Sequence, residues 1–139
     1  MADGFDIREF TEFERNLLRI ANETMPKESK KFLRNEGNKL KKKTLSKAKQ
    51  KVKKNTGYYF KSIKRGKVYK FNGDLSVRTF SSAPHAHLIE YGHRIVNKDG
   101  QEKGFKKGEH IFEDAKKEFQ DEYFSDAQKF IDEVLEKGL

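Results

Sequence analysis

The chain of 139 residues contains no cysteine, only two prolines and few apolar residues. Without cysteine it can form no disulfide, no thiolate metal site and no cysteine nucleophile. Its apolar runs fall well short of the roughly 18 residues that a membrane-spanning helix needs, so we expect no membrane contact. The start of the chain, with Asp3 and Asp6, lacks the apolar segment of a secretory signal peptide, and the cytoplasm is the expected compartment.

Apolar residues make up 34 % of the chain and charged residues 38 %. An ordinary globular domain contains about 45–50 % apolar residues, so we expect a thin core to which partner subunits add. Aromatic residues nevertheless reach 12 %, and a chain disordered throughout would be poor in them. The composition therefore predicts one folded domain over residues 1–139, built largely from amphipathic helices.

The net charge of +9 is concentrated in the middle of the chain. Residues 27–70 hold 18 basic and 2 acidic residues, a net charge of +16, whereas residues 1–26 have a net charge of −3 and residues 71–139 a net charge of −4. Such asymmetry indicates a contact with a polyanion or an acidic protein, or a charge-matched contact between neighbouring copies.

Apolar or small residues at steps of three and four predict three helices, over about residues 5–23, 26–54 and 109–137. Pro26 suits the first turn of the second helix, and Gly57 suits a left-handed cap at its end. The stripe of the second helix comprises Leu33, Gly37, Leu40, Thr44, Ala48 and Val52. The stripe of the third comprises Ile111, Phe112, Ala115, Phe119, Tyr123, Ala127, Phe130, Ile131 and Val134.

Residues 67–80 alternate between polar and apolar side chains around the turn sequence at 72–74, which predicts a β-hairpin. A lone hairpin is marginal in water, so it needs a third strand, a helix or a neighbouring subunit. A short helix ending at Gly92 is expected within residues 81–94, and the segment 95–109, with three glycines, is expected to be a mobile loop. The predicted class is α+β, with long N-terminal and C-terminal helices flanking a small antiparallel sheet.

Few residues suit catalysis or metal binding. His85, His87 and His93 could ligate zinc or a similar metal, but residues two apart do not share a helix face. Ser81 and Ser82 lie near His85, yet no Gly-x-Ser-x-Gly sequence surrounds them. No glycine-rich phosphate loop is present. We therefore expect no catalytic residue, no metal and no cofactor, and keep a histidine-based metalloenzyme only as a third hypothesis.

The lysine-rich second helix is the clearest signal in the composition. Clustered lysines neutralise phosphates, but lysine outnumbers arginine by 16 to 2 within residues 27–70, which argues against sequence-specific base reading. The equally favoured alternative is a solvated or subunit-facing surface. The lysines considered for DNA or subunit contact are Lys41, Lys42, Lys43, Lys47, Lys51 and Lys54.

The sequence Ser-Ala-Pro-His-Ala-His-Leu-Ile-Glu-Tyr-Gly at residues 82–92 resembles the signature of a tailed-phage family. The family comprises small head–tail joining or neck proteins, also called tail-completion or minor structural proteins, of long-tailed phages and prophages. A long basic helix before the signature and Gly108-Glu109-His110 before the last helix are also similar to the family layout. The signature residues that we expect to serve assembly are Pro84, His85, Leu88, Ile89, Glu90, Tyr91 and Gly92.

The resemblance implies a structural virion protein and no enzyme. It implies a homo-oligomeric ring at the head–tail junction, around the DNA channel, with the head connector and the tail terminator or tube proteins as partners and assembly in the host cytoplasm. Within the signature, Glu90 is expected to pair with a lysine or arginine or to contact a subunit. The charge distribution favours packing of the basic helix, residues 27–54, against an acidic surface of a neighbouring copy. The alternative function is non-specific nucleic-acid binding by the lysine-rich helix at residues 39–54.

Overall fold

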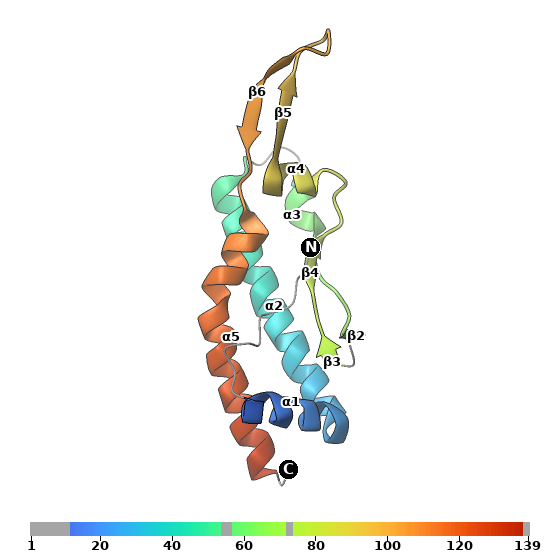
Figure 1. The fold of residues 1–139 in the computed structure, drawn as a ribbon, viewed down its shortest axis with the longest axis vertical. Coiled ribbons are helices and arrows are strands. Elements are labelled where there is room, and N and C mark those ends of the chain that lie inside the picture. Colours follow the sequence, from blue (N-terminus) through green and yellow to red (C-terminus); the bar gives the residue numbers. More distant parts are fainter. Residues whose placement is uncertain (1–11, 54–56, 72–73, 138–139) are drawn as a thin grey trace.

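Two long antiparallel helices, α2 and α5, form the axis of the molecule, and α1 crosses them near one end (Figure 1). Each long helix has 26 residues and is therefore about 39 Å long. The computed structural model describes residues 12–53, 57–71 and 74–137. The helices are α1 (Glu12–Thr24), α2 (Pro26–Lys51), α3 (Tyr58–Ser62), α4 (Ala86–Tyr91) and α5 (Ile111–Glu136), and the strands are β1 (Ile63–Arg65), β2 (Tyr69–Phe71), β3 (Asp74–Ser76), β4 (Thr79–Ser81), β5 (Gly92–Val96) and β6 (Glu102–Lys107). The predicted α+β class is confirmed.

The three predicted helices are present, with some changes at their ends. Residues 5–11 of the first lie outside the described part of the chain. Helix α2 begins at Pro26 but ends at Lys51, earlier than predicted, because Val52 takes an extended conformation. Gly57 does have a left-handed φ of 79°, but it precedes α3 and does not cap α2.

The core lies where α1, α2 and α5 meet. All predicted stripe residues of α5 are buried except Phe112, which is half-buried. Leu17 of α1 and Leu40 of α2 pack with Phe119 of α5 in the largest cluster. As expected from the composition, this core is thin and is confined to the interface between the helices. Its members on α2 are small residues for the most part, with Gly37, Leu40, Thr44 and Ala48 buried.

The predicted hairpin at residues 67–80 is confirmed and is longer than expected. Strands β2 and β3 pair near the turn, and β1 and β4 pair at the base, both antiparallel. The turn residues 72–73 lie outside the described residues. Helix α2 supports the hairpin at Gly37, where a Cβ atom would lie 2.8 Å from Cδ of Arg65. The hairpin was expected to need a third strand, a helix or a neighbouring subunit for support. In the structure, α2 of the same chain packs against it.

The segment predicted as a loop at residues 95–109 is largely a second hairpin, so this prediction was wrong. Strand β5 pairs with β6 from Gly92 opposite Lys107 to Val96 opposite Glu102. Every residue of β6 is exposed. Because neither face of this strand is buried, its sequence lacks the alternation that marks a half-buried strand. The predicted short helix before it is confirmed as α4, and Gly92 ends it.

Candidate functional site

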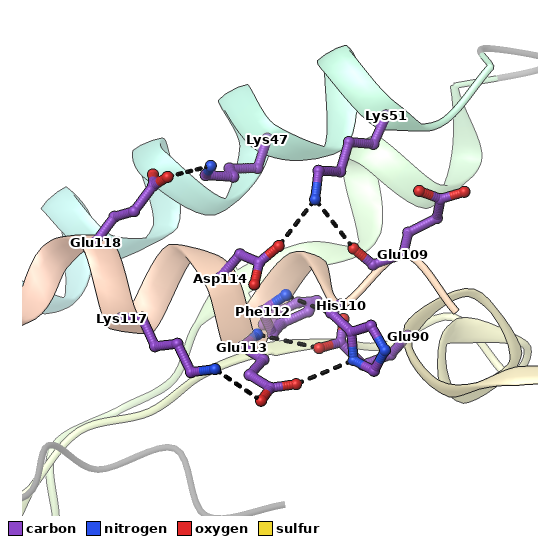
Figure 2. Close-up of polar contacts among 10 residues, drawn as sticks. All are labelled: Lys47, Lys51, Glu90, Glu109, His110, Phe112, Glu113, Asp114, Lys117 and Glu118. Atoms are coloured by element: carbon purple, nitrogen blue, oxygen red, sulfur yellow. Dashed lines mark hydrogen bonds and ion pairs between the residues drawn. The ribbon is translucent and has the colours of Figure 1, made fainter. Parts of the chain in front are cut away.

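The signature at residues 82–92 is centred on a buried carboxylate, that of Glu90, which is only 2 % exposed. Its Oε1 accepts a hydrogen bond from the backbone N–H of Phe112, and its Oε2 accepts one from that of Glu113, both at 3.0 Å (Figure 2). These N–H groups belong to the first turn of α5, where no intrahelical acceptor exists and negative charge is favoured. Glu90 therefore caps α5 from a different element.

Of the two roles expected for Glu90, pairing with a lysine or arginine is replaced by hydrogen bonds from the backbone of α5, and contact with another subunit stays a prediction. The carboxylate meets a helix N-terminus, because His110, the residue before α5, has a left-handed φ of 49° and gives no side-chain cap. A capping residue from α4 takes that place. Composition and spacing do not reveal such a contact, since the two residues that donate to Glu90 are 22 and 23 positions away.

Backbone hydrogen bonds also join the end of α4 to the residues just before α5, and we call this region the junction. The N–H of Glu109 donates to the carbonyl of Ile89 at 2.8 Å, and the N–H of His110 donates to that of Glu90 at 3.2 Å. A Cβ atom at Gly108 would lie 2.3 Å from the Glu90 carbonyl oxygen. Gly92 has a φ of 87°, and a Cβ atom there would lie 2.4 Å from the Lys106 carbonyl oxygen. Both glycines therefore allow an approach that no side chain would permit.

The other signature residues lie around this junction. Ile89 packs against the cluster of Ala48, Ile63 and Ile111, and Leu88 is half-buried. Pro84 and His85 are exposed, and Tyr91 is 55 % exposed. The structure thus divides the signature into an inward half, which holds α4, β5 and α5 together, and an outward half at the surface.

Glu90, His110 and Glu113 are close enough together to be tested as a metal site. His110 Nδ1 lies 3.0 Å from Glu113 Oε2, and Lys117 pairs with the same carboxylate at 3.2 Å. At this distance His110 forms an ion pair with Glu113 only if the imidazole is charged, and its Nδ1 has no hydrogen-bond partner among the described residues. Since both oxygens of Glu90 already accept backbone hydrogen bonds, the cluster is explained as a helix cap.

The hypothesised histidine site finds no geometric support. Within the described residues, His85, His87 and His93 do not form a group with metal-ligand spacing. His85 precedes α4, His87 lies within it, and His93 lies on β5.

A row of ion pairs joins the basic α2 to the acidic α5. Lys39 pairs with Asp126 at 2.7 Å, and Figure 2 shows the next two pairs, Lys47 with Glu118 and Lys51 with Asp114. The hydrogen bond between Lys51 and Asp114 raises the pKa of the lysine and lowers the pKa of the carboxyl. We call this row the charged seam; it comprises Lys39, Lys47, Lys51, Asp114, Glu118 and Asp126.

The charged seam provides within one chain an acidic partner that we expected from a neighbouring copy. Of the lysines considered for DNA or subunit contact, Lys47 and Lys51 are part of the seam. Lys41 and Lys43 are half-buried, Lys42 is exposed, and Lys54 lies outside the described residues. A signal for the seam was present in the sequence, because lysines and acids each recur every four residues along one face. They are Lys39, Lys43, Lys47 and Lys51 on α2, and Asp114, Glu118, Glu122 and Asp126 on α5.

A second buried carboxylate, Glu36, lies beyond the end of the seam and was not predicted. It is 2 % exposed, and its Oε2 has no hydrogen-bond donor among the described residues. It lines an open groove of about 690 Å³ between the N-terminal part of α2 and the C-terminal part of α5. Burial, together with the neighbouring Asp126 carboxylate, raises the pKa of Glu36 from 4.5 to about 8. Glu36 is therefore expected to hold a proton at neutral pH, which allows it to donate to Asp126.

Comparison with known proteins adds one finding to this geometry. The sequence profile of a family described as "Bacteriophage HK97-gp10, putative tail-component" matches residues 11–92, which extend from α1 through the signature. Searches among curated proteins and among solved structures found no match. In the described part of the chain, no helix has the length and apolar character needed to cross a membrane.

Proposed function

Because the chain belongs to the HK97 gp10-like family of bacteriophage tail components, we propose that it is a structural protein of the phage neck, which forms a ring around the DNA channel and joins the head connector to the tail. The family match carries this proposal. It supports a structural role in the virion, and the head–tail junction is the more specific location that the signature at residues 82–92 suggests.

The use of the signature residues agrees with a structural role. Glu90 is the signature's only carboxylate, and both of its oxygens accept hydrogen bonds from the backbone of α5. A general acid or base would need a carboxyl that can reach a substrate. Glu90 therefore holds elements together and is not free to act as a general acid or base.

The surface supports assembly with other subunits. Large hydrophobic residues that are at least two-fifths exposed occur on α1, α3, β2, α4, β5, β6 and the end of α5. Clusters of exposed apolar residues are typical of interaction surfaces. The residues are Phe13, Ile20, Tyr58, Phe71, Tyr91, Ile95, Val96, Phe105 and Leu135.

Deletion of the gene from the phage or prophage that carries it tests the proposal. We expect DNA-filled heads and complete tails to accumulate unjoined, and a plasmid copy of the gene to restore joined particles. In parallel, light scattering and negative-stain microscopy of the purified protein should show a ring, alone or with the head connector. Joined, infectious particles without the gene would contradict the proposal.

Non-specific DNA binding is a second candidate, supported by one face of α2. Residues spaced by three and four along its outward stripe are all exposed, and Lys31, Lys42 and Lys49 lie on this stripe. None of the three takes part in an ion pair among the described residues. In a ring, such a stripe suits phosphate contacts to the DNA in the channel.

Charge reversal separates this second function from a simple effect of net charge. Lys42→Glu with Lys49→Glu should weaken duplex DNA binding and reduce its salt dependence by about two phosphate contacts. The matched control, Lys61→Glu with Lys64→Glu, changes the same charge at exposed positions on other elements. An equal loss in both variants would contradict a role for this stripe.

A further inference from the structure

The two ends of the molecule carry exposed surfaces of opposite character. The ribbon formed by β5 and β6, residues 92–107, extends from one end of the paired helices, and α1 lies toward the other end (Figure 1). A two-stranded ribbon is only marginally stable by itself. A partner that covers one of its faces would therefore stabilise it.

One face of the ribbon combines two apolar side chains with two cations and one carboxylate, that of Glu102, and therefore has a net positive charge. Phe105 is 61 % exposed and Val96 is 57 % exposed. Phe105 is the cross-strand partner of Arg94, so these two lie on one face. Val96 follows Arg94 by two residues on β5 and lies on the same side; beyond a register shift between Ile95 and Val96, its cross-strand partner is Glu102. Lys107, two residues after Phe105, lies on the same face. We call this the Phe105 face.

The outward stripe of α1 has the matching pattern with opposite charge. Phe13 is 67 % exposed and Ile20 is 42 % exposed, while Leu17, on the inward side, is buried. Phe13 and Ile20 are seven residues apart and therefore share a face of the helix. Glu23, three residues after Ile20, is exposed on this stripe. Glu12 and Arg19 are exposed beside the stripe, and Arg19 pairs with Asp74 at 3.9 Å, which leaves the helix face with a net negative charge.

From this complementarity we infer that the Phe105 face of one copy packs on the outward stripe of α1 in the next copy, an inference that rests on the proposed ring. Apolar side chains would meet apolar ones, and Arg94 and Lys107 would lie near Glu12 and Glu23. Such charge matching fixes register and excludes other partners. The contact joins two different surfaces, so it repeats from copy to copy and can close into a ring.

Engineered disulfides test the contact directly, because the native chain has no cysteine. Full-length Phe13→Cys and Val96→Cys variants, mixed and oxidised, should form a disulfide-linked dimer, and neither variant alone should do so. The double variant should form a ladder of larger species. The matched control is Phe71→Cys, which is equally exposed on β2 and should not cross-link to Val96→Cys.

Charge reversal gives an independent measurement. Arg94→Glu should weaken self-association about tenfold, as expected for like charges facing each other at an interface, and adding Glu23→Arg should restore it. A wild-type ring that gives no Phe13–Val96 cross-link and tolerates Arg94→Glu would overturn this contact and leave the ring intact. A wild-type protein that stays monomeric at high concentration and with its neck partners would overturn the ring itself.

Discussion

Replacement of Glu36 by glutamine should remove most of the pH dependence of stability between pH 4.5 and 8. The pKa of Glu36 is raised to about 8, mainly by burial, from an ordinary value of 4.5. Within this window the folded protein holds a proton that the unfolded chain releases. Because the folded state then binds more protons, the free energy of unfolding falls as the pH rises.

The change in the free energy of unfolding follows from the difference between the pKa of Glu36 in the folded protein and its ordinary value. At about 1.4 kcal/mol per pH unit, a rise from 4.5 to about 8 sets a ceiling of about 5 kcal/mol. Water in the adjoining groove screens the ionised carboxylate, so we expect the wild-type protein to lose about 2 kcal/mol across the window. The charged groups that face Glu36 are Lys39 of the same helix and Glu122 and Asp126 of α5.

Glutamine keeps the size of the side chain and its ability to donate to Asp126, but it cannot ionise. Glu36→Gln should therefore match the wild type near pH 5 and exceed its stability above pH 8. Urea unfolding, monitored by circular dichroism at one fixed protein concentration, measures the free energy of unfolding of both proteins at each pH. Glu28→Gln, at an exposed position lining the same groove, is the control and should keep the wild-type slope. A flat wild-type profile, or an unchanged slope in Glu36→Gln, would refute the reasoning.

Substitutions at three further positions, Glu90 and Gly92 where α4 and β5 meet the start of α5 and Asp114 in the charged seam, are tested by urea unfolding at neutral pH. Glu90→Ala leaves two N–H groups of α5 without their acceptor and should cost about 2–4 kcal/mol, with a smaller loss for Glu90→Gln. Gly92→Ala, at a φ of 87° and with a Cβ atom 2.4 Å from a carbonyl oxygen, should cost about 1–3 kcal/mol; a neutral result would disprove the tight approach. Asp114→Asn should change stability little, because exposed ion pairs contribute little, and a large loss would contradict that.

The parts of the fold that the sequence predicts are those with a local cause. Helix α5 was predicted because its buried residues recur with the helix period, and the β2–β3 hairpin because apolar and polar residues alternate around a turn. The β5–β6 ribbon was missed because both of its faces are exposed. Glu90 was identified as an assembly residue, but pairing with a lysine or arginine was wrong, since its partner is the backbone of a helix distant in the sequence.

The charge pattern shows a different limit of sequence reasoning. The basic helix was expected to pack against an acidic surface of a neighbouring copy, whereas three of its lysines pair with acidic residues of α5 in the same chain. Spacing along a helix shows which side chains share a face. It does not show which other helix that face meets. The burial of Glu36 was not predicted, because an isolated acid among lysines is typical of the solvated face of a helix.

The charged seam alone does not set the alignment of the two long helices. Both of its stripes repeat every four residues, so a slip of about one turn would bring Lys39 to Glu122 and Lys47 to Asp114 and would re-form two ion pairs. The Lys39–Glu122 distance is already 4.0 Å. The cap formed by Glu90 does not repeat, because only the first turn of α5 offers unpaired N–H groups. The family signature is therefore best understood as the element that fixes α5 in one register, and with it the positions of the ribbon and of α1 on which the proposed assembly depends.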